Sequence, residues 1–176
     1  FKNLSIDGFK VADSWKVNPK LCREIVTESS DANRNSKWST ANHPYYRNAY
    51  YVLNPTGVKK YEEYSQIDWL KHYAETEGIE NVVLMLGANN ALGTILHLDV
   101  KQSEVIDGEL PHDADHEVRE YHKWNLWHPD HFHAEYKAFL DKVGEALKNN
   151  KYEKCNVFVG NVPHVTIAPL AKGFGP

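Results

Sequence analysis

The feature that most constrains the fold of this chain is an apolar run followed at once by turn residues, in the stretch VVLMLGANNALG from Val82 to Gly93. A short apolar run that begins with two valines and ends at turn residues is typical of a fully buried strand in a parallel sheet. Open α/β sheets bind ligands just beyond the carboxyl ends of their strands. The pattern therefore predicts that Gly87, Asn89 and Asn90 lie at a functional edge of a sheet.

A helix is expected immediately before this strand. Ser65 and Asp68 have the spacing of a helix-capping pair, with Asp in place of the usual Glu, and Gly78 ends the apolar periodicity. The helix leads into the strand predicted over residues 81–86. The order of elements here is helix, turn, buried strand.

The same alternation continues on both sides. The predicted elements are a short strand over 2–6, a mainly helical segment over 11–27 interrupted at Pro19, a helix over 132–149 and a strand over 155–159. Alternating helices and buried strands favour right-handed crossover units and a parallel sheet. Between the first helical segment and Tyr50, residues 28–48 lose periodicity and are expected to form a surface loop that Trp38, Tyr45 and Tyr46 attach to an apolar surface.

Composition excludes several classes of protein. With 176 residues, of which 41% are apolar and 25% charged, the chain can bury one sizeable core, so we expect a single domain over residues 1–176. The formal charge of −4 and the scattered Lys and Arg argue against nucleic-acid binding, and no apolar run is long enough to span a membrane. Cys22 and Cys155 stand far apart, which excludes a disulfide framework. There is no Gly-rich phosphate loop, and we expect no cofactor.

Three stretches together resemble the SGNH, or GDSL-type, hydrolases. NLSIDGFKVADS at residues 3–14 resembles the second conserved block of that family, and GANNALG at residues 87–93 resembles the third block, Gly-x-Asn-Asp, with Asn90 where Asp usually stands. VFVGNVPHVTIAPL at residues 157–170 is similar to the strand and loop that precede the last block. The ordered set covers nearly the whole chain, and each block taken alone is a weak signal.

The resemblance implies a fold and an activity. The fold would be a three-layer, flavodoxin-like, doubly wound parallel sheet, and the activity would be hydrolysis of a small-molecule ester. In the family, a backbone N–H from the second block and the Asn side chain of the third block stabilise the oxyanion, which places these roles on Gly8 and Asn89. Neutral, preorganised donors of this kind suit the tetrahedral oxyanion of acyl transfer. GANN considered alone is equally well explained as a turn, since Asn is common in turns.

The chain departs from the family pattern at both catalytic blocks. The family's nucleophile lies in a Gly-Asp-Ser motif that would precede Asn3, and its Asp-x-x-His block would follow Pro176. Ser14 follows Gly8 at a helix entry without a preceding apolar strand, and His164 ends a strand directly, so neither is expected to be catalytic. We therefore expect the nucleophile and the general base to lie outside these residues, together with the first strand and the C-terminal part of the sheet.

Residues 99–133 form the second informative region. Six of the ten histidines lie between His112 and His133, beside Trp124 and Trp127. Their spacing matches no standard zinc pattern, so solvated surface histidines are favoured over a metal site. Long loops in compact α/β domains are often functional, which suggests a lid-like insertion in which Trp124, Trp127 and Asn90 line a substrate pocket. Three-residue spacing of the two tryptophans is equally consistent with a helix face packed into the core.

Two functions remain open on the sequence. The first is an ester hydrolase with Gly8 and Asn89 as oxyanion donors and an unseen Ser and His as nucleophile and base. The second is a non-catalytic ligand-binding domain on the same scaffold. Because a fold does not fix a function, the resemblance alone does not separate them.

Overall fold

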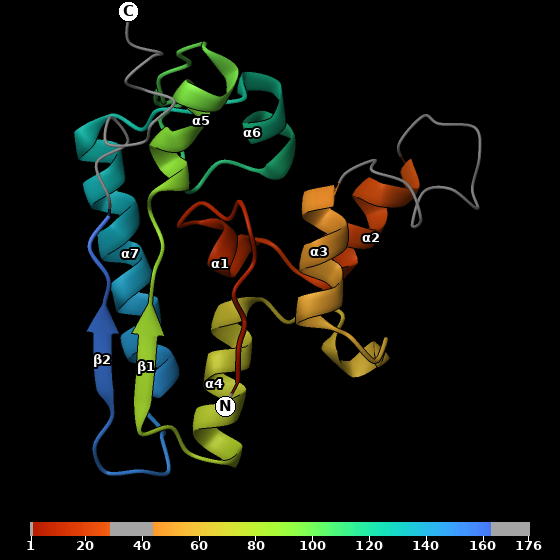
Figure 1. Ribbon diagram of the computed structural model, residues 1–176, viewed down its shortest axis with the longest axis vertical. Helices are drawn as coiled ribbons and strands as arrows, with labels where there is room; N and C mark the ends of the chain where they lie inside the picture. Colours follow the sequence, from red (N-terminus) through yellow and green to blue (C-terminus); the bar gives the residue numbers. More distant parts are fainter. Residues whose placement is uncertain (1, 29–43, 163–176) are drawn as a thin grey trace, which may run out of the picture. The chain divides into compact units, whose positions relative to one another are not determined.

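The computed structural model describes residues 2–28 and 44–162 of the chain (Figure 1). These residues form a mixed α/β structure that divides into two compact units, each assembled from three separate stretches of sequence. No helix among them is long and apolar enough to cross a membrane. The first unit comprises Phe1–Phe9, Asp13–Ile79 and Val143–Lys154, and the second comprises Lys10–Ala12, Glu80–Lys142 and Cys155–Pro176.

The first unit is mainly helical. Helix α2 (Pro19–Glu28) packs against α3 (Pro44–Leu53), and the short helix α1 (Asp13–Lys16) packs against α4 (Gln66–Thr76). A 3-10 turn, η1 (Lys59–Tyr61), lies between α3 and α4 in the sequence. The completely buried apolar side chains of this unit include Phe9, Cys22 and Leu53.

Helix α4 begins and ends as the sequence predicts. The Ser65 hydroxyl accepts a hydrogen bond from the Asp68 N–H, and the Asp68 carboxylate accepts one from the Ser65 N–H, which completes a capping box. Ser65 is buried, so these bonds replace water at the first turn. At the other end Gly78 has φ +86°, a conformation that favours glycine after a helix.

Two predictions for this part of the chain need correction, and one is confirmed. Residues 2–6 form no strand, because no described segment pairs with them. The segment 11–27 is mainly helical and interrupted, as predicted: it forms two helices, and the second begins at Pro19, whose missing N–H is not needed at a helix start. Tyr45 and Tyr46 belong to α3, so residues 44–48 are helical and not part of a loop. Trp38 and His164 lie outside the described residues.

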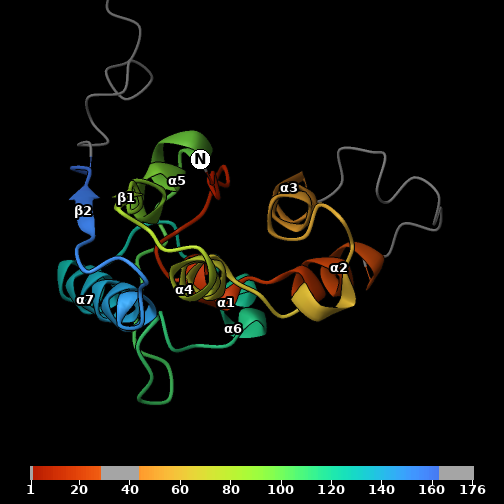
Figure 2. The same ribbon diagram turned by 90° about the horizontal axis from the view of Figure 1, so that it is seen from below.

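The second unit holds a small parallel sheet. Strand β1 (Asn81–Leu84) pairs with β2 (Asn156–Val159), with Val83 opposite Phe158. The predicted parallel pairing is therefore confirmed, and the described residues form a two-stranded sheet. Helix α7 (Pro129–Leu147), whose residues up to Lys142 belong to this unit, lies along one face of the sheet in both views (Figures 1 and 2).

The prediction that β1 is fully buried is wrong. Its side chains alternate, with Val82 and Leu84 buried and Val83 66% exposed, and the following Met85 is also exposed. Alternation arises because successive side chains of a strand point to opposite faces, and only one face of this sheet is covered by α7. The apolar run therefore predicted the strand correctly, but only alternate side chains of the strand are buried.

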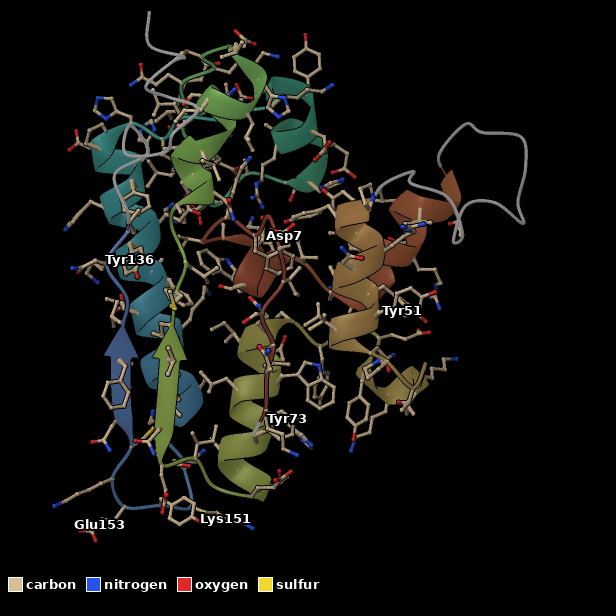
Figure 3. The ribbon with its side chains drawn as sticks, viewed as in Figure 1. Asp7, Tyr51, Tyr73, Tyr136, Lys151 and Glu153 are labelled. Carbon is tan, nitrogen blue, oxygen red and sulfur yellow. The ribbon has the colours of Figure 1, made fainter. Side chains whose placement is uncertain are left out.

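The predicted helix over 132–149 is confirmed as α7, which begins three residues earlier and ends two residues earlier. Phe132, Tyr136 and Phe139 follow one another along it, with ring centroids 5.6 Å and 5.8 Å apart. Figure 3 labels Tyr136 on this helix. Burial raises the pKa of the Tyr136 hydroxyl. The remaining helices of the unit are α5 (Asn89–His97) and, within the predicted insertion 99–133, α6 (His116–His122).

Candidate functional site

The turn after β1 is held in a conformation that only glycine accommodates. Gly87 has φ +118°, and a Cβ atom there would lie 2.7 Å from Val162 Cγ2 and 3.0 Å from Phe132 Cζ. Helix α5 then begins at Asn89, which is half-buried in its first turn. The structure therefore places Asn89 at the carboxyl end of a strand and at a helix N-terminus, where partial positive charge favours an anion.

Asn90 ties this turn to the residues that follow Gly8. Its Oδ1 accepts a hydrogen bond from the Val11 N–H at 3.1 Å, and its backbone carbonyl accepts one from the Trp127 N–H at 3.0 Å. The side chain is 1% exposed. Asn90 is predicted to line a substrate pocket, but these hydrogen bonds join it to protein groups within the second unit.

A buried carboxylate completes this network. Glu135, on α7, is completely buried, and its Oε1 accepts a hydrogen bond from the Ala12 N–H at 2.6 Å. The Asn90 Nδ2 amide donates to both Glu135 oxygens, at 3.3 Å and 3.2 Å. Residues 11 and 12 are thus bonded to the GANN turn directly through Asn90 and indirectly through Glu135. Sequence reasoning missed Glu135, which occupies an inward position of α7 between Ala134 and Tyr136.

Gly8 has a positive φ, which favours glycine, and it belongs to the first unit. Its φ is +82°, and a Cβ atom would lie 2.9 Å from Tyr45 Cδ2, so a side chain is excluded. Among the described residues, no group accepts a hydrogen bond from the Gly8 N–H. The pairing of Gly8 with Asn89 across the two units stays a prediction.

Trp124 and Trp127 are core residues of the second unit. They are 3% and 6% exposed, their rings meet edge to face at 6.3 Å, and they cluster with Ala114. The Lys10 ammonium lies 4.9 Å from the centroid of the Trp127 ring and donates to the Trp124 carbonyl at 2.8 Å. The alternative prediction, that the two tryptophans pack into the core, agrees with this burial, although they lie on a loop and not on a helix. Their contact with a substrate stays a prediction.

One serine and one histidine come within hydrogen-bonding distance in the insertion. The Ser103 Oγ lies 2.9 Å from His131 Nδ1 and accepts a hydrogen bond from the His128 N–H at 2.9 Å. Ser103 is only 5% exposed, so its hydroxyl is closed to a substrate. Within the 99–133 segment, these contacts join the loop at Ser103 to the start of α7.

Two further sequence expectations concern this region. Ser14, which we did not expect to be the nucleophile, lies in α1 and is 1% exposed. Within the described part of the chain, no group of three or more His, Cys, Asp or Glu side chains is arranged to hold a metal ion. Comparisons of the chain with family models, with curated proteins and with solved structures find no match.

Proposed function

We propose that this chain forms part of an ester hydrolase of the SGNH type, on a flavodoxin-like doubly wound sheet, in which Gly8 and Asn89 supply the oxyanion hole. The single observation that supports it best is the hydrogen bond from the Val11 N–H to the Asn90 side chain. This bond joins the two sequence blocks that the family resemblance assigns to the oxyanion donors. Residues 79 positions apart are held together at the carboxyl end of β1.

The chemistry is acyl transfer. A serine Oγ from outside residues 1–176 attacks the ester carbonyl carbon while a histidine accepts the hydroxyl proton. The carbonyl oxygen becomes an oxyanion that accepts hydrogen bonds from the Gly8 N–H and the Asn89 amide. Collapse of the tetrahedral intermediate breaks the bond to the alcohol oxygen, which receives the proton from histidine. Water then gives a proton to the histidine as it attacks the acyl carbon, and collapse of the second intermediate breaks the bond to the serine oxygen, which takes the proton back as the carboxylic acid is released.

In this proposal Asn90 and Glu135 are positioning residues. The Asn90 side chain fixes the first turn of α5, and Glu135 fixes both Asn90 and residue 12. Oxyanion donors contribute most when they are held in place before the reaction, because no reorganisation is then needed. A completely buried, hydrogen-bonded carboxylate behind the turn serves that purpose.

The test uses the natural protein with p-nitrophenyl acetate as substrate and a fluorophosphonate probe for the nucleophile. Asn89→Ala should lower kcat by about 10²–10³-fold, the usual effect of removing one oxyanion donor. Asn149→Ala is the matched control, because Asn149 is an exposed asparagine distant from the turn in sequence. Loss of kcat in Asn89→Ala without loss of probe labelling would separate the oxyanion role from damage to the nucleophile.

Two outcomes contradict the proposal. A natural protein that neither gains a probe adduct nor hydrolyses the ester has no serine nucleophile, and the non-catalytic binding domain then takes the place of the enzyme. An active protein in which Asn89→Ala changes kcat no more than Asn149→Ala does would retain the enzyme and remove Asn89 from the oxyanion hole.

A further inference from the structure

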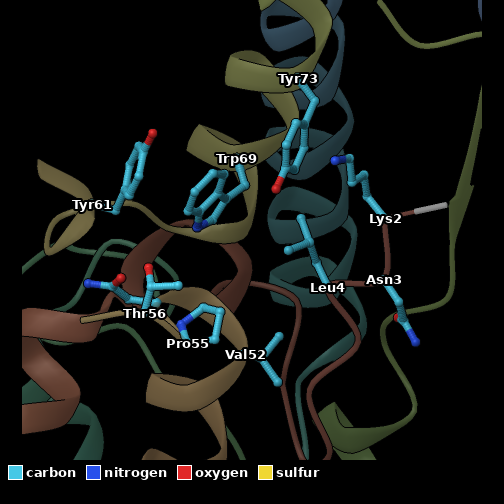
Figure 4. Close-up of a pocket in the computed structure, with 10 residues that line it drawn as sticks. Lys2, Asn3, Leu4, Val52, Pro55, Thr56, Tyr61, Trp69 and Tyr73 are labelled. Carbon is cyan, nitrogen blue, oxygen red and sulfur yellow. The ribbon is translucent and has the colours of Figure 1, made fainter. Parts of the chain in front are cut away.

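The segment that leads to Gly8 belongs to no sheet, and a cavity lies beside it. Residues 2–4 line this cavity of about 370 Å³ together with Val52 of α3 and with aromatic side chains of α4 (Figure 4). The Gln66 amide donates to the Leu4 carbonyl there. Because residues 2–6 pair with no described strand, no ladder of hydrogen bonds continues from this segment to the turn. The position of Gly8 therefore depends on contacts made at the turn itself.

Tyr45, in the first turn of α3, lies against the backbone of Gly8. A Cβ atom at Gly8 would lie 2.9 Å from Tyr45 Cδ2 and 3.2 Å from Tyr45 Cε2, so the ring fills the space that a side chain would need. The same ring lies 5.4 Å from the ring of Phe9, which is completely buried. Tyr45 and Val52 are seven residues apart, so they share the face of α3 that is turned toward this segment.

A buried carboxylate fixes the other end of the Tyr45 side chain. The Tyr45 hydroxyl donates a hydrogen bond to Asp13 Oδ2 at 2.5 Å, and Asp13 is 5% exposed. Asp13 is the first residue of α1, and its backbone carbonyl accepts a hydrogen bond from the Val17 N–H at 3.0 Å. The Tyr45 ring is thus held on one side by the start of α1 and lies on the other against the turn at Gly8.

The turn leaves the N–H of Gly8 available. It is closed by the Phe9 N–H, which donates to the Ile6 carbonyl at 3.5 Å. The φ of +82° at Gly8 is the value that glycine supplies at the third residue of such a turn. In the described part of the chain the Gly8 N–H has no acceptor. The backbone alone determines the direction of this donor, and the Tyr45 ring packs on that backbone.

We propose that Tyr45, held by Asp13, is a positioning residue that fixes the Gly8 N–H for an oxyanion. This inference rests on the proposed ester hydrolysis, in which Gly8 is one of the two donors. A donor that is fixed before the reaction stabilises the transition state more than one that must first reorient. Tyr45 acts through Gly8, and no contact with the substrate is assigned to it.

The Gly8 N–H can be observed by NMR with a control in the same spectrum. Residues 1–176 contain two Asp–Gly pairs, Asp7–Gly8 and Asp107–Gly108. Protein labelled with ¹³C at Asp carbonyl carbons and ¹⁵N at Gly gives a selected amide signal for each pair, and Asp7→Glu and Asp107→Glu assign them by removing one signal each. Gly108 belongs to the second unit, and no described heavy atom lies within 4 Å of a Cβ placed on it. Its signal should not respond to Tyr45.

The spectra are recorded on the natural protein before and after reaction with the fluorophosphonate probe. The serine oxygen displaces fluoride from phosphorus, and the phosphonyl oxygen of the adduct then takes the place of the oxyanion. We expect the Gly8 signal to move downfield on adduct formation, because its N–H gains an acceptor. The movement should be smaller in Tyr45→Phe, which keeps the ring and loses the bond to Asp13, and smallest in Tyr45→Leu, which also loses the ring.

Hydrolysis of p-nitrophenyl acetate should follow the same order. Misplacing a reacting group by about 1 Å can cost about 10²-fold in rate, so kcat should fall by about 10²-fold in Tyr45→Leu and about tenfold in Tyr45→Phe. Asp13→Asn keeps an oxygen that accepts from the Tyr45 hydroxyl and should retain kcat to within about threefold. Tyr51→Phe is the matched control, since Tyr51 is on the same helix and 52% exposed (Figure 3).

Failure of the inference differs from failure of the proposed function. A natural protein without adduct and without hydrolysis is no serine hydrolase, and an adduct that leaves the Gly8 signal unmoved removes Gly8 from the oxyanion hole. An adduct that moves the Gly8 signal equally in the natural protein and in Tyr45→Phe, with the kcat of Tyr51→Phe, keeps Gly8 as a donor and overturns the role of Tyr45. Should Tyr45→Leu not fold, Tyr45→Phe alone decides, because the inference requires the bond to Asp13.

Discussion

The variants Asn90→Asp and Glu135→Gln, which exchange the amide and the carboxylate between the two positions, test whether the contact of these residues organises the turn after β1. The Asn90 amide donates to the completely buried Glu135 carboxylate, and the Ala12 N–H donates to the same carboxylate. An aspartate at position 90 would place two carboxylates within about 3.3 Å, the present distance from the amide nitrogen to the farther oxygen. The contact with Glu135 therefore favours an amide over a carboxylate at position 90.

The magnitudes follow from what each variant leaves unpaired. Glu135→Gln sets one amide N–H group against another and should cost about 1–3 kcal/mol, the cost of a buried donor without a partner. Asn90→Asp adds a second buried charge and should cost at least about 3 kcal/mol. In the double variant the new amide at position 135 donates to the new carboxylate at position 90 and still accepts from the Ala12 N–H. The network is restored with its charge moved to the other position.

The assay is urea denaturation of the four proteins of the double-mutant cycle. Their free energies of unfolding are comparable when the four m-values agree. Because the double variant restores the network, the coupling free energy should approach the sum of the two single losses, at least about 4 kcal/mol, which is above the usual range for contacting residues because Asn90→Asp alone places two buried carboxylates together. Effects that add to within about 0.5 kcal/mol would refute the reasoning, because independent sites behave in that way.

Two further stability measurements test local features of the first unit. Ser65→Ala removes the capping hydroxyl of α4 and should lower the free energy of unfolding by about 1 kcal/mol; Thr76→Ala, at the exposed end of the same helix, is the control, and an equal effect of the two would contradict the cap. Burial raises the pKa of the Cys22 thiol from 9.0 to about 12. The native state keeps this proton while the unfolded chain loses it, so this contribution to stability is complete below about pH 9 and falls as the pH rises toward 12, by at most about 1.4 kcal/mol per pH unit. The loss should be absent in Cys22→Ala, and parallel pH profiles of the two proteins in chemical denaturation would exclude it.

Local patterns predicted the elements of this chain better than their surroundings. The capping pair Ser65 and Asp68 specified the start of α4, because both of its hydrogen bonds form within three residues. The apolar spacing of α7 was equally clear. The strand expected over 2–6 failed for the opposite reason: a strand needs a neighbour, and the sequence of five residues does not show whether one is present.

In the candidate site, too, local features are predicted from the sequence better than long-range contacts. The turn at Gly87 is predicted by the sequence, since glycine and asparagine after an apolar run are local turn signals, whereas the helix that begins at Asn89 is not among the predicted elements. The buried contact between Asn90 and Glu135 joins residues 45 positions apart. The spacing of Phe132 and Phe139 puts position 135 on the apolar face of α7, but no local signal identifies Asn90 as its partner. Long-range pairing of this kind is set by packing, which periodicity does not encode.

The exposed face of the sheet leads to the last prediction. Parallel sheets are usually covered on both faces, yet Val83 and its register partner Phe158 are 66% and 55% exposed in the described residues. If this face is open in the natural protein, Val83→Thr should change the free energy of unfolding by no more than about 0.5 kcal/mol, as expected at an exposed site. Leu84→Ala, on the covered face of the same strand, should cost about 2–5 kcal/mol.

The two substitutions are measured together by chemical denaturation, since they lie on adjacent residues of β1 and differ in the face that they alter. A loss at Val83 that approaches the loss at Leu84 would contradict an open face. In that case a further layer, formed by segments outside the described residues or by a second molecule, covers β1 and β2. The apolar run that first indicated a strand buried on both faces would then have been right about its burial, and the alternation seen here would describe the sheet without that layer.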